Sequence, residues 1–382
     1  MAVTKAIVAR EPKFTALSWE LEDVIVNEDP GDNEVLVEMV ASGVCHTDIV
    51  LSAVPAGQFG IYYPKVMGHE GSGYARKIGK NVTAVQVGDP VLLSFYSCGT
   101  CDQCEEEHPA YCHSFASENY IGRKGHVNFA EGGKEEIYSR FFGQSSFARY
   151  SIVDQASVVN AKDLVNDEEE LKLFAPLGCG FQTGMGAVDN IVKPDSRDVI
   201  VVVGLGSVGL AALMTANLRN CKAIVGVDRI PNRLQLAKEL GATHIIDTSL
   251  PGHSLHKAIC ELFPAGVSAV LDTTGSPQQI EDGVRSLRQR GKLVLIGVPP
   301  LPYELGVSAI EHMNMGRSVV GCLEGDCVPA EAIATLIKWY REGRFPMEKL
   351  ITYFKADEFK EALAGLDDGS VVKAVLKWDT TA

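Results

Sequence analysis

Four cysteines in one short segment constrain this chain more than any other feature. Cys98, Cys101, Cys104 and Cys112 follow the spacing C-x2-C-x2-C-x7-C. Thiolates on tight C-x2-C turns supply the four soft donors of a tetrahedral Zn²⁺ site, each at about 2.3 Å from the metal. A site of this kind is closed and leaves no position for a substrate. We therefore expect it to brace one lobe of the protein, with catalysis left to other residues.

Two disulfides in a secreted domain are the alternative reading of these cysteines, and that reading needs an oxidising compartment. The N-terminal residues MAVTKAIVAREPKF lack the apolar core of a signal peptide. Ten cysteines without such a signal are typical of a reducing, cytoplasmic setting in which thiols bind metal. The sequence therefore favours structural zinc and a cytoplasmic location.

Length and charge exclude some classes of function. A chain of 382 residues predicts two domains, and a net charge of −14 argues against binding to nucleic acid, whose phosphates it would repel. One apolar stretch, Val199–Ala216, approaches the length of a membrane span. Glycines in its middle divide it into a buried strand, a turn and the start of a helix. We therefore expect no membrane-spanning segment.

The pattern of secondary structure changes along the chain. The first third is rich in strand signals, such as the alternating segment Glu34–Val40. From about Thr183, apolar strands such as Asp198–Val203 and Ala223–Val227 alternate with helix-compatible segments. This alternation predicts an α/β fold with a doubly wound parallel sheet. The predicted domains are residues 1–180, 181–322 and a C-terminal return, 323–382, to the first lobe.

Three separated residues are candidates for a second metal site. Cys45 lies in the segment GVCHTD, His69 in GHEG and Cys179 in PLGCG. Taken singly, a cysteine usually only packs and a loop histidine is usually a surface residue. A catalytic zinc site has three protein ligands and leaves the fourth position to water or substrate. Together the three residues match that requirement.

A glycine-rich turn follows the strand Asp198–Val203 and opens a helix. Its pattern G-x-G-x-x-G predicts that a dinucleotide pyrophosphate binds at the helix N-terminus. Asp228, at the end of the next strand, favours the ribose hydroxyls of NAD over the phosphate of NADP, although Arg229 softens that repulsion. A generic strand–helix turn is the alternative. The turn consists of Gly204, Leu205, Gly206, Ser207, Val208 and Gly209.

The motifs GVCHTD, GHEGSG, the four-cysteine segment, PLGCGFQTG and GLGSVG occur in the order and spacing of the zinc-dependent medium-chain alcohol dehydrogenases. The resemblance extends over essentially the whole chain. FFGQSSF at Phe141–Phe147, together with APLGCGFQTG, resembles most the aryl (benzyl) and allylic alcohol dehydrogenase branch. The resemblance implies a GroES-like, β-rich catalytic domain with the structural zinc loop at 98–112, joined to a Rossmann domain that binds NAD.

The resemblance also assigns the metal site. It implies that Cys45, His69 and Cys179 ligate a catalytic zinc, which makes two zinc ions per subunit. Asp48 would orient His69, in keeping with the usual need to fix a ligand imidazole. Glu70 would lie behind the metal and ligate it transiently.

Roles in binding the alcohol and the cofactor follow in the same way. Thr47 would accept the hydrogen bond of the alcohol, while Val50 replaces a histidine that relays the proton in many relatives. Ser94 replaces a frequent aromatic residue in the substrate pocket, and Phe141 and Phe142 remain its aromatic candidates. Cationic contacts to the cofactor would come from His46, Arg233 and Lys373, and the nicotinamide would be lined by Thr183, Ile296 and Val298.

The implied reaction interconverts a primary alcohol, aryl or allylic, and its aldehyde by hydride transfer from a zinc-bound alkoxide to NAD. A thiol-adduct formaldehyde dehydrogenase of the same family is one alternative. A non-catalytic binding or scaffold protein with the same fold is another. Gly316–Gly325 resembles the edge strand through which family dimers extend their sheets, which implies a homodimer or homotetramer.

Overall fold

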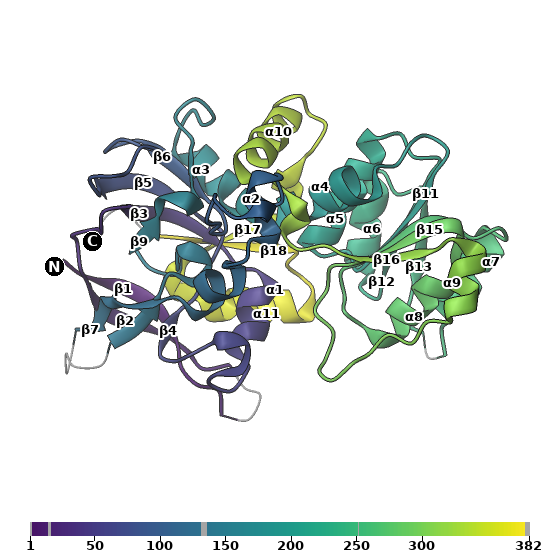
Figure 1. Ribbon diagram of the computed structural model, residues 1–382, viewed down its shortest axis with the longest axis horizontal. Helices are drawn as coiled ribbons and strands as arrows, with labels where there is room; N and C mark the ends of the chain where they lie inside the picture. The colour runs from purple at the N-terminus through teal and green to yellow at the C-terminus, as the bar shows by residue number, and fades with distance from the viewer. Residues whose placement is uncertain (1, 14–16, 131–135, 251, 379–382) are drawn as a thin grey trace. The chain divides into compact units, whose positions relative to one another are not determined.

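The computed structural model describes residues 2–13, 17–130, 136–250 and 252–378 (Figure 1). The chain divides into two compact units. The first unit contains Met1–Cys179, Val328–Lys338 and Glu348–Ala382, and the second contains Gly180–Cys327 and Trp339–Met347. The C-terminal tail is therefore shared, whereas the sequence assigns all of it to the first lobe.

Aromatic packing explains why part of the tail belongs to the second unit. The ring of Phe345 meets that of Phe181 edge-on, with centroids 6.3 Å apart, and Phe345 is fully buried. The guanidinium of Arg219 lies 5.9 Å from the ring centroid of Trp339. These contacts hold 339–347 against the second unit.

The first unit is built from strands. One group closes into a barrel in the order β1-β2-β7-β8-β4. The other forms a sheet in the order β10-β6-β5-β3-β18-β17, with β9 also paired to β3. The barrel strands are β1 (Ala2–Ala9), β2 (Trp19–Val26), β4 (Lys65–Val66), β7 (Arg123–Phe129) and β8 (Glu136–Ser139). The sheet strands are β3 (Glu34–Gly43), β5 (Gly71–Ile78), β6 (Pro90–Leu93), β9 (Tyr150–Asp154), β10 (Val158–Asn160), β17 (Ile351–Lys355) and β18 (Lys373–Lys377).

Strand β3 confirms the strand predicted at Glu34–Val40. Nearly every residue of β3 is buried. The reason is that α3 (Glu168–Phe174) and the turn at Ala175–Gly178 pack on it. The other helices of this unit are α1 (His46–Ser52), α2 (Asp102–Glu105) and α11 (Phe359–Asp368), and α10 (Pro329–Arg341) begins in it.

The second unit is a parallel sheet with strand order β13-β12-β11-β14-β15-β16, which confirms the predicted doubly wound fold. The sequence neighbours β13 and β14 lie on opposite sides of the pair β11–β12, so the order reverses at β11. The strands are β11 (Val199–Val203), β12 (Ala223–Asp228), β13 (His244–Asp247), β14 (Val267–Asp272), β15 (Leu287–Leu295) and β16 (Ser318–Gly321). The helices are α4 (Gly180–Gly186), α5 (Ser207–Leu218), α6 (Pro231–Glu239), α7 (Leu255–Leu262), α8 (Pro277–Arg285) and α9 (Ala309–Met315).

The apolar stretch Val199–Ala216 is a strand, a turn and most of a helix, as its glycines predict. β11 is buried along its whole length, as expected for a central parallel strand covered on both faces. Across the residues that the structure describes, no helix combines the length and the apolar character needed to cross a membrane.

Two glycines shape the turn between β11 and α5. Gly204 has φ +88°, a conformation that other residues rarely adopt. A Cβ on Gly209 would lie 1.8 Å from the carbonyl oxygen of Gly204. The helix can therefore approach the turn only because residue 209 has no side chain. Gly206 differs, since a Cβ there would meet nothing within 4 Å.

We predict that Gly209→Ala lowers the free energy of unfolding of the second unit by about 2–3 kcal/mol, because the methyl group overlaps rigid backbone. Gly206→Ala is the matched control and should unfold close to the native midpoint. Urea unfolding followed by circular dichroism measures both. Equal midpoints for the two variants would show that the close approach at Gly209 does not constrain the turn.

Candidate functional site

The four cysteines of the predicted structural zinc site lie together. Their sulfur atoms all fall within 4.8 Å of one another, and the Cys98–Cys104 and Cys101–Cys104 separations are 4.0 and 3.5 Å. Tetrahedral bonds of about 2.3 Å need sulfurs roughly 3.8 Å apart. Hydrogen bonds from the backbone N–H and hydroxyl of Thr100 lower the pKa of Cys98 to about 6, which favours the thiolate. The segment therefore fits a closed metal site, and each of its cysteines is a free thiol.

The three other predicted ligands also meet. Cys45 precedes α1, His69 lies between β4 and β5, and Cys179 follows the turn at Ala175–Gly178. Their ligand atoms lie within 4.8 Å of one another, and the sulfurs of Cys45 and Cys179 are 4.0 Å apart. All three residues are buried. Within the described residues the Nε2 atom of His69 is buried and has no hydrogen-bond partner. A buried nitrogen facing two thiols is the donor set that zinc prefers.

Asp48 fixes the orientation of that imidazole. Its Oδ1 atom lies 2.9 Å from His69 Nδ1 and accepts from the backbone N–H of Gly68 at 3.0 Å. Its Oδ2 atom accepts from the backbone N–H of Cys45 at 3.0 Å. One fully buried carboxylate thus connects two of the predicted ligands and directs His69 Nε2 toward the sulfurs.

The electrostatics of the cluster favour a positive charge at its centre. The hydrogen bond with Cys179 and the charge of His69 bring the pKa of Cys45 well below its usual range despite burial. Burial by itself would lower the pKa of His69, but the charges of Asp48 and Cys45 outweigh it and raise this pKa. A divalent cation held by the same atoms satisfies this preference. The residues present therefore fit a zinc ion.

Glu70 and Lys373 form a buried ion pair next to this cluster. The Nζ atom of Lys373 lies 2.9 Å from each carboxylate oxygen of Glu70 and donates to the carbonyl oxygen of Val44 at 3.1 Å. Burial raises the pKa of the Glu70 carboxyl, and the charge of Lys373 opposes that rise. These three contacts engage all the donors of the ammonium group. The ammonium of Lys373 is thus engaged with Glu70 and Val44, and the cofactor contact expected of Lys373 stays a prediction.

The predicted pocket residues Phe141 and Phe142 pack against His69. The ring of Phe142 stacks on the imidazole with centroids 4.5 Å apart, and the ring of Phe141 meets it edge-on at 5.6 Å. Phe115 and Tyr120 in turn contact Phe142, at 5.9 and 5.7 Å. The aromatic residues that the sequence assigns to the substrate thus also support a ligand.

The hydroxyl of Ser94, the predicted pocket residue that replaces an aromatic side chain, bonds the backbone. Ser94 is buried, and its Oγ atom donates to the carbonyl oxygen of Gly178 at 2.6 Å. Sequence reasoning missed the partner of this serine, Gln144. The Nε2 atom of Gln144 donates to the carbonyl oxygens of His69 and Ser94, at 2.9 and 3.0 Å. Gln144 lies inside the FFGQSSF motif, which was read only as a mark of the family branch.

The predicted dinucleotide residues lie at the carboxyl ends of β11 and β12 in the second unit. The Oδ2 atom of Asp228 accepts from the backbone N–H of Leu205 at 2.7 Å, and its Oδ1 atom from those of Arg229 and Ile230 at 2.7 and 3.0 Å. The carboxylate that is predicted to select NAD thus also holds the glycine-rich turn in place.

The remaining predicted cofactor residues are distributed over both units. Ile296 follows β15, and Val298, two residues on, is 56% exposed. Thr183 is buried in α4, and Arg233 lies in α6. In the first unit, His46 is the exposed first residue of α1, and Thr47 follows it.

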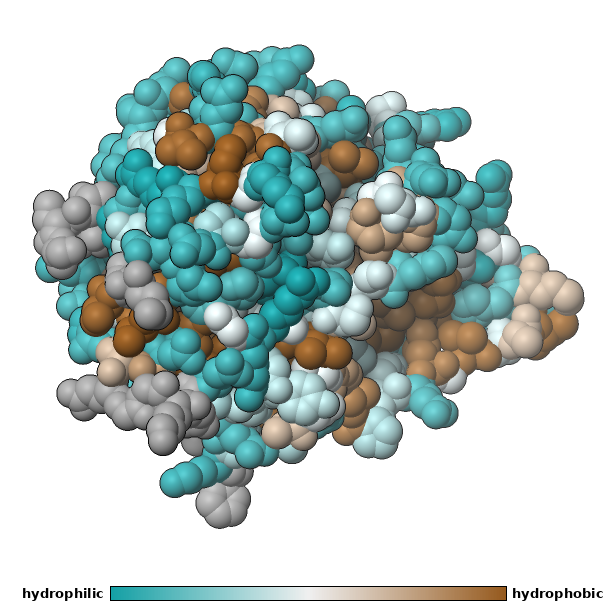
Figure 2. Space-filling model, turned by 60° about the vertical axis from the view of Figure 1, so that its left-hand side comes forward, coloured by the Kyte–Doolittle hydropathy of each residue, from teal (hydrophilic) through white to brown (hydrophobic). Residues whose placement is uncertain are grey.

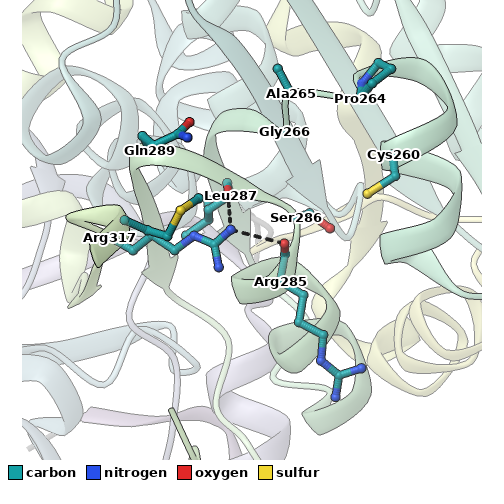
Figure 3. Close-up of a pocket in the computed structure, with 10 residues that line it drawn as sticks. Cys260, Pro264, Ala265, Gly266, Arg285, Ser286, Leu287, Gln289 and Arg317 are labelled. Carbon is teal, nitrogen blue, oxygen red and sulfur yellow. Dashed lines mark hydrogen bonds between the residues drawn. The ribbon is translucent and has the colours of Figure 1, made fainter. Parts of the chain in front are cut away.

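A cavity of about 330 Å³ lies in the second unit and contains none of the predicted site residues (Figure 3). Arg317 reaches its wall and donates to the backbone carbonyl oxygens of Leu287 and Arg285 (Figure 3). Its guanidinium thus bonds the protein's own backbone, and the cavity offers no arrangement comparable to the metal cluster.

We predict that Lys373→Met lowers the stability of the first unit by about 3–5 kcal/mol, because it leaves the Glu70 carboxylate buried without its cation. The double variant Lys373→Met/Glu70→Leu should recover most of that loss. Differential scanning calorimetry of the native protein and the two variants measures the effect. A single variant as stable as the native protein would contradict the buried ion pair.

The chain is similar to known proteins along most of its length. Residues 31–163 match the family model of the alcohol dehydrogenase GroES-like domain, and residues 207–342 match that of the zinc-binding dehydrogenases. A geraniol dehydrogenase of Castellaniella defragrans is 34% identical over 93% of both chains. The crystal structure of benzyl alcohol dehydrogenase from Acinetobacter calcoaceticus superposes with a TM-score of 0.88 at 35% identity, covering 99% of this chain and 100% of that one.

A further crystal structure, an alcohol dehydrogenase zinc-binding domain protein from Burkholderia ambifaria, has a TM-score of 0.89 at 33% identity and covers 98% of this chain and 99% of that one. The similarity thus spans both compact units and the two cysteine-containing sites. The chain belongs to the zinc-dependent medium-chain alcohol dehydrogenase family.

Proposed function

We propose that the protein is an NAD-dependent enzyme with two zinc ions per subunit that interconverts a primary aryl or allylic alcohol and its aldehyde. The observation that carries the proposal is the buried cluster of Cys45, His69 and Cys179, in which the Nε2 atom of His69 faces two thiols. Intact ligands at this site argue against a scaffold protein that has only kept the fold.

Each residue of the site has a defined task in this reaction. A zinc ion held by the three ligands supplies a Lewis acid that lowers the pKa of an alcohol hydroxyl and polarises an aldehyde carbonyl. Asp48 keeps the His69 imidazole in the orientation that presents Nε2. Thr47 accepts the hydrogen bond of the alcohol. Val50 cannot titrate, so the proton leaves by a route that does not use this position.

The aromatic or allylic substrate is inferred from two relatives and from the composition of the site. One relative is described as a geraniol dehydrogenase and another as a benzyl alcohol dehydrogenase. Phe141 and Phe142 place aromatic rings beside the predicted metal ligand. Flat or unsaturated substrates pack well on such rings. The alternative, a thiol-adduct formaldehyde dehydrogenase, would instead prefer a hydroxymethyl thiol.

Assembly and location complete the proposal. β16 pairs with β15 and ends the sheet, and nearby residues of the second unit expose apolar side chains, namely Val298, Leu301, Val307, Ile310 and Met313. On the face that Figure 2 shows, apolar side chains interrupt a largely hydrophilic surface. A second copy that covers this edge gives a homodimer or homotetramer. The free thiols of both metal sites suit a reducing, cytoplasmic setting.

The activity and its metal requirement are tested together. We expect the purified protein to contain two zinc ions per chain and to reduce NAD with benzyl or geraniol-type alcohols faster than with hydroxymethyl thiols. Cys179→Ser should contain one metal ion fewer per chain. Its kcat should fall at least a hundredfold, since a catalytic ligand is removed. Cys112→Ser is the control at the four-cysteine site. This variant should lose the other metal ion and should unfold at a lower temperature. A Cys179→Ser variant that keeps full turnover would contradict the proposed site.

Cofactor choice is tested at Asp228. We predict that Asp228→Asn raises the Kd of NAD about tenfold and changes that of NADP much less, because the lost charge served the ribose hydroxyls of NAD and repelled the NADP phosphate. Titration of intrinsic protein fluorescence with each cofactor measures both constants. Parallel weakening of the two cofactors would mean that Asp228 acts only by holding Leu205.

A further inference from the structure

Hydrogen bonds through Gln144 and Ser94 connect the backbone of one predicted zinc ligand, His69, to that of Gly178, the residue before another. The path starts at the carbonyl oxygen of His69, which accepts from Gln144 Nε2 at 2.9 Å. The same amide nitrogen donates to the carbonyl oxygen of Ser94 at 3.0 Å. The hydroxyl of Ser94 then donates at 2.6 Å to the carbonyl oxygen of Gly178, the residue before Cys179. Gln144 and Ser94 are both buried, with 0% and 1% exposure.

The carbonyl oxygen of the Gln144 amide forms a second hydrogen bond with the segment that contains His69. Gln144 Oε1 accepts from the backbone N–H of Gly71 at 3.0 Å. The side chain thus bonds the backbone on both sides of Glu70, through His69 and Gly71. It uses its two N–H donors and its carbonyl oxygen entirely on the backbone of the site. Such a set of contacts fixes position and offers nothing to a substrate.

The loop that carries Gln144 is itself held in a strained conformation. Arg140, Phe142 and Ser145 all have positive φ, at 65°, 51° and 56°. Backbone of this kind persists only when its surroundings determine it. The buried Arg140 pairs with Glu34 at 2.9 Å and with Asp154 at 2.8 Å.

A second anchor of this loop comes from Ser145. Its Oγ atom donates to the carbonyl oxygen of Val66 at 2.6 Å. The loop is therefore a rigid base for the Gln144 side chain.

At Gly178, where this path of hydrogen bonds ends, two backbone segments lie in close contact. A Cβ on Gly178 would lie 1.9 Å from the carbonyl oxygen of Leu93 and 3.2 Å from Cα of Ser94. The segment that leads into Cys179 thus lies directly against the strand end that carries Ser94. Because no side chain separates the two segments, the Ser94 hydroxyl sets their register.

We infer that Ser94 and Gln144 are positioning residues that fix the spacing of His69 and Cys179, and thereby the geometry of the zinc site. The inference rests on the proposed function, because it concerns the same metal. Asp48 performs the corresponding task between Cys45 and His69. Two sets of hydrogen bonds thus connect the three ligands. The Asp48 carboxylate connects Cys45 with His69, and the Gln144 amide with the Ser94 hydroxyl connects His69 with the residue before Cys179. Outer hydrogen bonds of this kind commonly change metal affinity or activity by 10–100-fold.

The test compares two buried serines of the same unit. Ser94→Ala removes the hydroxyl that holds Gly178. Ser146→Ala is the matched control, since Ser146 is equally buried and its hydroxyl bonds that of Ser42, at 2.6 Å. Both variants lose one oxygen atom and should fold, which circular dichroism verifies. Gln144→Met, which removes all three contacts of the amide, is a second variant of the same chain.

The first readout is release of the catalytic zinc to a chelator, followed in the holoenzyme by the loss of one metal ion per chain. We expect Ser94→Ala and Gln144→Met to release this ion about tenfold faster than the native protein, and Ser146→Ala to release it at the native rate. With cobalt(II) replacing zinc at this site only, the visible absorption of Ser94→Ala should shift, since it reports ligand geometry. The kcat of Ser94→Ala should fall about tenfold with little change in KM.

If Ser94→Ala matches Ser146→Ala in metal release and in the cobalt spectrum, the inference is wrong even if the native enzyme is active with two metal ions. If instead the native protein holds only the metal of the four-cysteine site, the proposed function fails first, and the positioning role fails with it. The metal content of the native protein therefore separates the two outcomes.

Discussion

The imidazole of His69 holds the structure of the site together. One of its nitrogens is bonded to a buried carboxylate, and the other is buried beside two thiols without a partner in the described part of the chain. A buried polar atom that lacks a hydrogen bond costs free energy, and here the cost is offset when a metal ion binds. The stacked ring of Phe142, the Asp48 carboxylate and the amide of Gln144 all contact this residue and restrict its position. The barrel and sheet of the first unit bring these groups together from distant parts of the sequence.

The second unit carries the backbone N–H groups that we propose bind the cofactor pyrophosphate. Its parallel strands end at one edge, and the glycine-rich turn between β11 and α5 lies there. Asp228 stabilises that turn by accepting from the backbone N–H of Leu205, and we propose that the same carboxylate binds the cofactor ribose. Under this proposal one residue serves both structure and recognition, so a substitution at this position needs readouts for both.

Much of this arrangement could be predicted from sequence. Short motifs with tight spacing, such as the four cysteines and GLGSVG, predict their own local geometry because their residues are close in sequence. Cys45, His69 and Cys179 are far apart in the chain, and only the family resemblance brought them together in advance. The alternation of strands and helices identified the parallel sheet because buried parallel strands are continuous apolar runs, as β11 is.

What sequence reasoning missed depends on contacts between residues that are distant in the chain. No sequence pattern reveals that the ammonium of Lys373 lies against Glu70, about three hundred residues away in sequence. No sequence pattern reveals that the hydroxyl of Ser94 bonds the carbonyl oxygen of Gly178. Gln144 has no motif of its own, and the role we infer for it depends on two backbone segments, at His69–Gly71 and at Ser94, that its side chain bonds. The burial of both faces of β3 likewise depends on α3, which no local pattern reveals.

The central claim is that this chain builds an open metal site from two sulfurs and one imidazole, separate from the closed four-sulfur site. X-ray absorption at the zinc edge of the native protein tests it most directly. The account predicts two metal ions per chain, with four sulfurs around one and two sulfurs, an imidazole nitrogen and a lighter ligand around the other. A spectrum that shows only sulfur ligands, from one metal ion per chain, would contradict it.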